Sequence, residues 1–529
     1  MQSKPCLLRF LAAQPTQREW IARRQAALHW IGSKNPHIHQ PSQCDRIPSA
    51  RLPSEFDEIT PGDSGQLCGQ ACAHWHCFAH QDDFVLAVTT RHPLSLRLMK
   101  TLQTDVLVCG GGCAGIAAAL AAARNGAQTL LIERAGFSGG IITTVGLPYF
   151  DGLIDKPSGR FVVKGIALEL LNKLGVAKEG AQRIDDLRPD LITKYWGSVW
   201  IPNIEEFKIL TDDLILQHRD KLRVLYHSTA CDVEVKEGRV AAVIIANKDG
   251  LTRVEARQVI DCTGDGDIAH WAGCPTTSSK PLMPLTMHFR IGNVVPVKET
   301  REAAKQALIA AHKEGRLPNF YGPGLIFAFA KDECYVHATR VPANATDAAD
   351  FTRAEMQGRK DAWTMFNDWK AKVPGFENSY YIMSGPFIGV RDTRRIVGLN
   401  VLTLEDLQQT TRHADAIATG CWFLDIHPPE VTLDKPFTGS GFQPKPYDIS
   451  YRTLVPQTVS NLLVAGRCHS ASSEASASSR VTATAMALGE AAGTAAALAM
   501  AAKSEIGTLD GVKVREALAK QNAGPFSDA

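Results

Sequence analysis

The sequence predicts an α/β protein of at least two lobes, in which a parallel sheet with flanking helices carries an inserted mixed α+β region. Two observations lead to this prediction. A strand, a glycine-rich turn, a helix and a second strand follow one another between Thr104 and Gly140, which is typical of a βαβ unit. At 529 residues the chain is also too long for one ordinary core.

The first strand is predicted at Thr104–Cys109, and it runs into glycines spaced as G-x-G-x-x-G. Gly110 permits a tight turn, Gly112 lets the backbone approach a pyrophosphate, and Gly115 lets the next helix pack closely on the sheet. The alanine-rich run Ala114–Arg124 has high helix propensity and small side chains. This turn therefore predicts a dinucleotide site.

The second half of the unit strengthens that prediction. Asn125 and Gly126 are a good helix stop, and Thr129–Ile132 is a short β-branched and apolar run that ends at Glu133. An acidic residue at the end of the second strand of such a unit binds ribose hydroxyls in dinucleotide-binding folds. The spacing from the glycine turn to Glu133 agrees with that role.

Further elements follow from periodicity and turn signals. We predict helices over residues 161–174, 204–218 and 481–502, strands over 222–227, 231–235, 240–247, 256–261, 283–294 and 461–466, and a Ser/Ala loop over 468–480. We expect residues 99–145, 222–281 and 456–505 to form the dinucleotide-binding domain. Residues 146–221 and 282–455 would form a substrate or cap domain, and 506–529 a C-terminal tail.

Residues 1–98 differ from the rest of the chain. They contain a His- and Cys-rich segment that includes Cys68, Cys72, His74 and Cys77, but its spacing matches neither a zinc site nor an iron–sulfur site. We therefore predict no metal there. We expect this segment to be disordered or to lie outside the functional protein, with translation starting at Met99.

Composition excludes several classes of partner. The net charge is +2, which gives no electrostatic case for nucleic acid or for an anionic membrane surface. The most apolar helix, Ala483–Ala502, is interrupted by Glu490, and the N-terminal residues do not resemble a signal peptide. Scattered cysteines, 13 in all, indicate reduced thiols. We expect a cytoplasmic protein that binds neither membrane nor nucleic acid.

Four separated motifs now carry a resemblance that covers residues 103–503. They occupy residues 105–140, 259–269, 389–398 and 461–499, in that order. The chain resembles the FAD-dependent oxidoreductases with a glutathione-reductase-type flavin fold, and within them the group related to the A-type subunit of heterodisulfide reductase. The resemblance implies a Rossmann-like FAD-binding domain and bound FAD.

The resemblance also assigns cofactor contacts by position. Glu133 would bind the adenosine ribose, Val233 would offer backbone groups to adenine, and the helix that starts near Thr482 would direct its dipole at the flavin N1/O2 edge. The full set of expected cofactor residues is Gly110, Gly112, Gly115, Glu133, Arg134, Gly139, Gly140, Val233, Thr263, Gly264, Gly466, Arg467 and Thr482. The group also implies a 4Fe-4S cluster, but the cysteines after residue 100 have no cluster spacing.

Three residues are our candidates for the chemistry. Arg391 and Arg480 would clamp an anionic substrate group, because a guanidinium binds a carboxylate through two parallel hydrogen bonds; salt bridges within the protein are the alternative interpretation. Arg394 and Arg395 are weaker candidates for the same role. His288 would be an acid or base, or else a satisfied buried histidine. No Cys-x-x-Cys pair follows the flavin strand.

The sequence thus predicts an FAD-dependent oxidoreductase that transfers a hydride between an unidentified small organic substrate and flavin N5. The electron donor or acceptor is unknown. Two alternatives stay open: an electron-transfer flavoprotein subunit of a heterodisulfide-reductase-like complex, and a non-catalytic flavin-binding scaffold.

Overall fold

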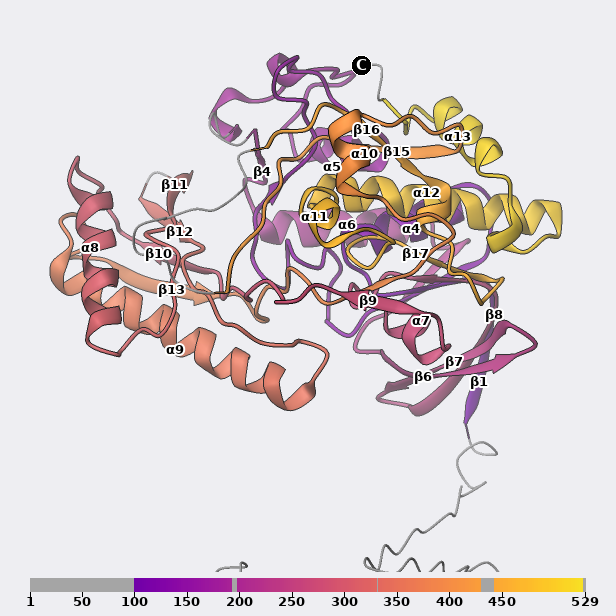
Figure 1. Ribbon diagram of the computed structural model, residues 1–529, viewed down its shortest axis with the longest axis horizontal. Helices are drawn as coiled ribbons and strands as arrows, with labels where there is room; N and C mark the ends of the chain where they lie inside the picture. The colour runs from indigo at the N-terminus through magenta and orange to yellow at the C-terminus, as the bar shows by residue number, and fades with distance from the viewer. Residues whose placement is uncertain (1–98, 193–196, 331, 430–441, 527–529) are drawn as a thin grey trace, which may run out of the picture. The chain divides into compact units, whose positions relative to one another are not determined.

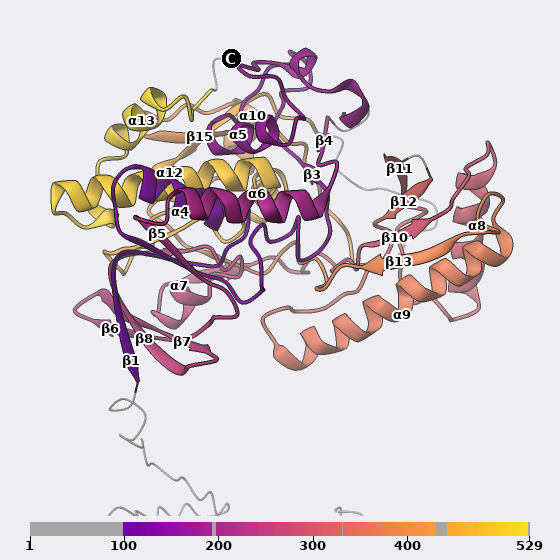
Figure 2. The same cartoon turned by 180° about the vertical axis from the view of Figure 1, so that it is seen from behind.

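The computed structural model describes residues 99–192, 197–330, 332–429 and 442–526 (Figures 1 and 2). The chain divides into two units, Met1–His92 and Pro93–Ala529, and every element named below belongs to the second. The predictions for residues 1–98, including the cysteine-rich segment, lie outside the described residues.

The main sheet has seven strands and carries the dinucleotide motif. Its strands run in the order β5-β2-β1-β8-β7-β6, and β17 pairs with β8. Their bounds are β1 Lys100–Cys109, β2 Thr129–Ile132, β5 Leu222–Leu225, β6 Thr229–Lys236, β7 Arg239–Asn247, β8 Gly250–Asp261 and β17 Leu462–Val464. Strands β1, β2, β5, β8 and β17 pair in parallel, whereas β6, β7 and β8 form an antiparallel meander. The predicted α/β fold class is confirmed.

The last four residues of β1, Val106–Cys109, are buried on both faces, as a central parallel strand should be. Val106 and Val108 pack into the core beneath helix α4 (Cys113–Arg124), whereas Leu107 and Cys109 point to a second core on the side of the meander. Because successive side chains alternate between faces, one short apolar run supplies both cores.

Helix α12 (Thr482–Ala502) lies along α4, and the two helices cover the same face of the sheet (Figures 1 and 2). A Cβ added at Gly489 would lie 2.0 Å from the carbonyl oxygen of Ala114, and one at Gly493 would lie 2.1 Å from that of Ala118. The glycines therefore permit the close helix contact that the small residues predicted. Helix α12 is also long and apolar enough to cross a membrane, but 78% of its apolar window is buried inside the protein.

A second sheet forms the cap, on the left in Figure 1. It is a four-stranded antiparallel sheet in the order β11-β12-β10-β13, accompanied by two helices. Their bounds are β10 Phe289–Gly292, β11 Leu325–Ala330, β12 Glu333–Val336, β13 Tyr380–Ser384, α8 Thr300–Lys313 and α9 Ala348–Lys372. Phe289, Met365 and Trp369 belong to its separate hydrophobic core.

The two cores divide the chain differently from our predicted domain boundaries. Among the described residues, the buried side chains of the cap core come from Leu285 to Ile388. Segments that we placed in the cap, such as Phe150–Leu174 and Leu402–Leu454, contribute side chains to the core around α4 and α12. Helix α5 shows the reason, because the backbone N–H of its Ile166 donates to the Glu490 carboxylate of α12 at 2.9 Å.

Further helices and strand pairs complete the described fold. They are α5 Gly165–Lys173, α6 Ile204–Gln217, α7 Asp267–Trp271, α10 Leu404–Gln409, α11 Ser473–Ser479, α13 Gly511–Lys520, and the strand pairs β3 Tyr149–Phe150 with β4 Val199–Trp200, β9 Thr276–Ser278 with β14 Arg394–Ile396, and β15 Ala416–Gly420 with β16 Tyr447–Ser450. Short 3₁₀ turns occur at Ile184–Asp186, Pro189–Leu191, Tyr451–Thr453 and Ile506–Thr508.

Three predicted elements differ from the structure. The predicted Ser/Ala loop contains helix α11, whose start is capped by the Ser472 hydroxyl accepting from the Ala475 N–H. The predicted helix at residue 161 begins only at Gly165, because Phe161 is extended and donates its N–H to the Gln182 carbonyl. The predicted strand 283–294 shortens to Phe289–Gly292, while Leu285 forms an isolated bridge with Val341.

Candidate active site

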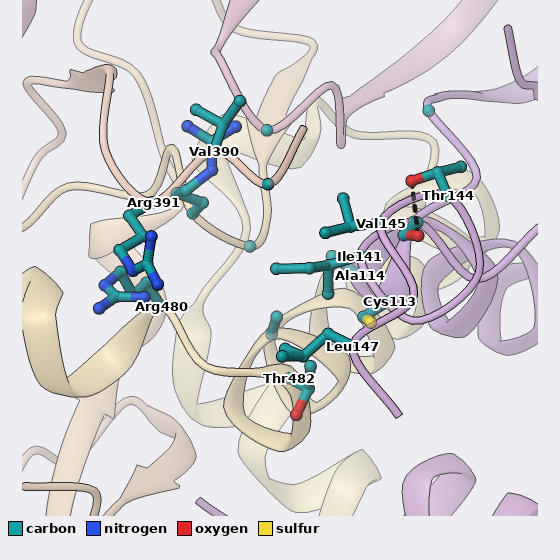
Figure 3. A pocket seen from close by; sticks show the side chains of 18 of the residues that line it. Cys113, Ala114, Ile141, Thr144, Val145, Leu147, Val390, Arg391, Arg480 and Thr482 are labelled. Carbon is teal, nitrogen blue, oxygen red and sulfur yellow. Dashed lines mark hydrogen bonds between the residues drawn. The ribbon is translucent and has the colours of Figure 1, made fainter. Parts of the chain in front are cut away.

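One large pocket opens where the parallel strands end. Cys109, Ile132, Cys262 and Ala465 line it, and each lies at or just beyond the carboxyl end of β1, β2, β8 or β17. This is the edge at which open α/β sheets bind ligands. From there the pocket continues to the cap, where Arg391 and Arg480 lie on its far wall (Figure 3).

The glycine turn forms a cradle at the sheet end of the pocket. Gly110 has φ +100°, and a Cβ there would lie 2.5 Å from the carbonyl oxygen of Cys262. A Cβ on Gly115 would lie 1.7 Å from the Gly110 carbonyl oxygen. Gly112 is different, because a Cβ there would meet nothing closer than the Cα of Gly140 at 3.7 Å. A side chain at Gly112 would therefore occupy the pocket itself.

The first turn of α4 begins at this cradle with its N–H groups available. Gly112 is its N-cap and provides no side-chain cap, and the first turn contains no acidic residue. Such a helix start carries positive partial charge and binds phosphate groups. The position agrees with the pyrophosphate role predicted for Gly110, Gly112 and Gly115, although Gly115 packs the helix and does not line the pocket.

Glu133 lines the pocket at the end of β2, and its carboxylate is held by the backbone. Its two oxygens accept hydrogen bonds from the Gly111 N–H at 2.6 Å and from the Ala135 N–H at 2.8 Å. A carboxylate offers about four lone-pair positions, so two remain for ribose hydroxyls. The geometry suits the predicted ribose contact.

A second glycine loop closes against the first. The Gly139 N–H donates to the Gly111 carbonyl at 2.8 Å, and a Cβ on Gly140 would lie 2.6 Å from the Cα of Gly112. Gly140 lines the pocket, whereas Gly139 only supports it. Arg134 also lines it, and its guanidinium lies 5.0 Å from the centre of the Phe387 ring.

The turns after β8 and β17 form the next wall. Thr263 and Gly264 line the pocket, but the Thr263 hydroxyl is bonded within its own turn to Asp261 at 2.7 Å. Gly466 and Arg467 line it too. The Arg467 guanidinium donates to Asp265 at 2.8 Å, so it fastens these two turns to each other.

Val233 does not fit the adenine role that we predicted. It lies in the middle of β6 and is not among the residues that line the pocket; Ser228, Thr229 and Ala230, at and just before the start of that strand, are. Thr482 does line the pocket, at the uncapped start of α12, where its hydroxyl accepts from the Asp151 N–H at 2.7 Å.

The far end of the pocket is polar, and we call it the polar chamber. It is lined by the side chains of Tyr149, Asp151, Ser198, Trp200, His288, His337, Arg391, Trp422, Asp425, His427 and Arg480. These residues lie in or beside β3 and β4, beside β10 and β12 of the cap sheet, just before β14, in the segment after β15, and at the junction of α11 with α12. All three of our catalytic candidates, Arg391, Arg480 and His288, line this chamber.

Asp425 is the centre of the charged groups in the chamber. It accepts from Arg480 Nη2 at 2.9 Å and from His427 Nε2 at 2.8 Å. Burial opposes its ionisation, but His427, Arg480 and Arg391 together hold its pKa below the usual range. Burial lowers the pKa of His427 to about 3, so this imidazole is neutral at pH 7, with a proton on Nε2 toward Asp425 and Nδ1 toward Arg340.

His288 lies beneath the chamber and does not act as a cation at neutral pH. Burial, reinforced by the charge of Arg391, holds its pKa well below the usual value. Its Nδ1 is hydrogen-bonded to the Tyr335 hydroxyl, and Tyr335 in turn is hydrogen-bonded to Tyr149. Arg290, two residues further on in β10, pairs with Glu333 in the cap sheet.

Asp151 is a chamber residue that the sequence did not reveal. Its carboxylate accepts from the Ser198 hydroxyl at 2.5 Å, and burial raises its pKa to about 7. It therefore exchanges a proton near neutral pH, which suits an acid or base. The only sequence signal is its place just after the short strand Tyr149–Phe150, which periodicity does not distinguish from a loop.

Other candidates have structural roles. Arg395 is buried and pairs with Asp392, while Arg394 pairs with Asp267, so neither serves the chamber. The buried His469 bridges the Gly466 carbonyl and the Ser479 hydroxyl. Burial raises the pKa of Cys113 to about 12, so this thiol stays protonated at neutral pH.

The glycine cradle and the uncapped α4 start offer N–H donors to a pyrophosphate, and the fixed Glu133 carboxylate offers acceptors to ribose hydroxyls, so these residues fit FAD. They define a flavoprotein-type dinucleotide site that continues into a substrate chamber. The chain belongs to the FAD-dependent oxidoreductase family, whose profile matches residues 105–518. It is therefore an FAD-dependent oxidoreductase.

Individual relatives are distant. A digeranylgeranylglycerophospholipid reductase of Methanopyrus kandleri is 29% identical over 194 residues, which is 34% of this chain and 42% of that protein. The chain thus matches less than half the length of this curated relative. A geranylgeranyl bacteriochlorophyll reductase-like protein of Thermoplasma acidophilum shares 15% identity at a TM-score of 0.40, covering 80% of this chain and 84% of that one. A flavin-dependent brominase shares 13% sequence identity at a TM-score of 0.40, and the match covers 80% of this chain and 84% of the brominase.

Proposed function

We propose that this protein is an FAD-dependent dehydrogenase or reductase that transfers a hydride between an organic substrate in the polar chamber and flavin N5. The observation that carries the proposal is the continuity of one pocket from the Gly112 cradle to the chamber around Arg391. When bound, FAD supplies hydride acceptance or donation at N5. The substrate, the electron partner and the place in the cell are unassigned.

In this proposal different residues bind the cofactor, transfer the proton and orient the substrate. Glu133 binds the ribose and the α4 start binds the pyrophosphate of the adenosine diphosphate portion, and the uncapped start of α12 at Val481 favours negative charge near Thr482. Asp151, whose pKa is raised to about 7 by burial, gives or takes the proton that accompanies hydride transfer. Neutral His288 orients the substrate by a hydrogen bond from its Nε2.

A reductase of isoprenoid chains is a second candidate, because the Methanopyrus kandleri relative bears that name. The chamber favours the first proposal, since Asp151, Arg391, Asp425 and Arg480 present charge where a geranylgeranyl chain would need an apolar channel. A relation to the heterodisulfide reductases and a non-catalytic flavin scaffold also remain alternatives.

An anaerobic substrate screen tests the proposal. Candidate organic acids, alcohols and amines are added to the FAD-loaded protein, and bleaching of the flavin absorbance is followed; the reduced protein is screened in the same way with unsaturated acids as oxidants. The proposal expects a substrate to change the flavin's redox state, and Asp151→Asn to slow that change. Flavin that responds only to an artificial reductant or an electron-carrier protein would favour the scaffold or the electron-transfer role.

A further inference from the structure

The positive charge of Arg391 lacks a carboxylate partner among the residues that the structure describes. Its Nη1 donates to the Pro284 carbonyl at 2.9 Å and to the Thr286 hydroxyl at 2.6 Å, and both acceptors are neutral. Its Nε and Nη2 have no acceptor in the described part of the chain. One edge of the guanidinium therefore faces the chamber with its hydrogen-bonding capacity unused.

Arg480 adds a second cation to the same wall of the pocket, next to Arg391 (Figure 3). Its Nη2 donates to both the backbone and the carboxylate oxygen of Asp425, at 2.9 Å each. Its buried Nε has no partner among the described residues. Asp425 thus offsets about one of the two charges and leaves the other without a counter-ion.

The environment makes that remaining charge costly. Burial, followed by the charge of Arg480, lowers the pKa of Arg391 to about 10, so the guanidinium is still charged at pH 7. An unpaired buried cation is unfavourable in the protein interior unless an anion joins it. Asp151 supplies little compensation, because burial keeps it partly protonated at that pH.

The rest of the chamber indicates an organic anion. Tyr149 and Trp200 form an edge-to-face pair with ring centroids 5.0 Å apart, and Trp422 lines the same space. Aromatic rings of this kind pack against carbon, whereas the two guanidinium edges suit a planar group with two oxygens. A carboxylate attached to a carbon skeleton satisfies both features.

We propose that Arg391 and Arg480 together bind a carboxylate of the substrate, so that the enzyme acts on an organic acid. This inference rests on the proposed function, because it places that acid beside the cofactor in the same pocket. In this inference Arg391 binds the substrate carboxylate. Arg480 keeps its hydrogen bond to Asp425 and also contacts the ligand. Arg340 is left out, because its donors are taken by Thr286, His337, Thr339 and His427.

Matched acids and amides provide the test. The FAD-loaded protein is titrated with benzoate and benzamide, and separately with butyrate and butyramide, by calorimetry and by the change in flavin absorbance. Each amide keeps the shape of its acid and loses the charge. In at least one pair the acid should bind at least tenfold more tightly, and Arg391→Gln should abolish that preference while FAD content stays the same. Arg391→Lys, which keeps the charge but not the planar fork, should retain part of it.

The controls separate this inference from the proposed function. Arg316→Gln removes a surface arginine that pairs with Glu314 and Asp368, and it should leave acid binding unchanged. Equal binding of acid and amide in both pairs, or an undiminished preference in Arg391→Gln, would overturn the carboxylate site even though the protein holds FAD. Inorganic phosphate that binds more tightly than either acid would overturn it as well. A protein that holds no FAD would instead refute the proposed function before any titration.

Discussion

Tyr335 and His288 form a hydrogen-bonded pair in which the tyrosine hydroxyl meets Nδ1 of the imidazole, and both side chains are buried. They join two parts of the cap, because Tyr335 lies in β12 and His288 lies just before β10. The ring planes are nearly parallel, at 21°. We assign the Tyr335 hydroxyl as the donor to Nδ1, which leaves the proton of the neutral imidazole on Nε2, close to Gly389 in the pocket wall.

This pair predicts one tautomer for His288. In protein carrying ¹⁵N-labelled histidine, the Nδ1 of His288 should give the shift of a hydrogen-bond acceptor and Nε2 that of a protonated nitrogen. The ring should stay neutral from pH 8 to pH 5, because burial and Arg391 hold its pKa well below the usual value. Tyr335→Phe should move the Nδ1 shift without charging the ring. An imidazolium signal at pH 6 would contradict this assignment.

Gly112 and Gly115 should respond oppositely to the same substitution. Gly112→Ala places a methyl group in the pocket and touches no protein atom closer than 3.7 Å, so the protein should keep its melting temperature without cofactor and lose FAD. Gly115→Ala forces a Cβ to 1.7 Å from the Gly110 carbonyl oxygen, so it should lower stability by about 2 kcal/mol or more. Thermal melts of both cofactor-free variants and their flavin-to-protein ratios check the contrast.

Glu133→Ala should weaken FAD binding at least tenfold, which corresponds to about 1.4 kcal/mol. The substitution removes the expected ribose acceptor, and it also frees the Gly111 N–H that the carboxylate now binds. Equilibrium dialysis against FAD gives the affinity. The control is Glu255→Ala, which should leave the FAD affinity unchanged. Glu255 is an acidic residue of the same sheet and accepts hydrogen bonds from Gln103 and Arg253. Equal FAD affinity in the two variants would refute the role of Glu133.

Glu490 predicts a pH dependence of stability that is independent of the active site. Burial raises its pKa to about 7, so the folded protein keeps a proton that the unfolded chain releases above its ordinary pKa. The contribution of this group to the free energy of unfolding is therefore largest at low pH, and it falls as the pH rises toward 7. Glu490→Gln, which retains an acceptor for the Ile166 N–H, should raise the free energy of unfolding more at pH 8 than at pH 5, by up to about 3 kcal/mol. An equal shift at both pH values would show that Glu490 is ionised in the folded protein.

Residues close together in the sequence were predicted to meet, whereas contacts between segments far apart in the sequence were missed. Gly110 to Glu133 lie within one βαβ unit, so local spacing predicts how they meet. Asp151, Asp425 and His427 belong to short or irregular segments that only the folded chain brings together. Val233 lies outside the pocket lining because position along a strand depends on register, which the hairpin pattern alone does not determine. Arg391, Arg394 and Arg395 look alike in sequence, and only their partners Thr286, Asp267 and Asp392 separate the ligand-facing residue from the structural ones.

The absorption spectrum of the purified protein tests the central claim most directly. The account predicts a yellow protein whose spectrum is that of a flavin and which releases FAD on heating, at close to one FAD per chain. The bound flavin should disappear in Gly112→Ala. A colourless protein that cannot be reconstituted with FAD would contradict the claim that this pocket is a flavin site.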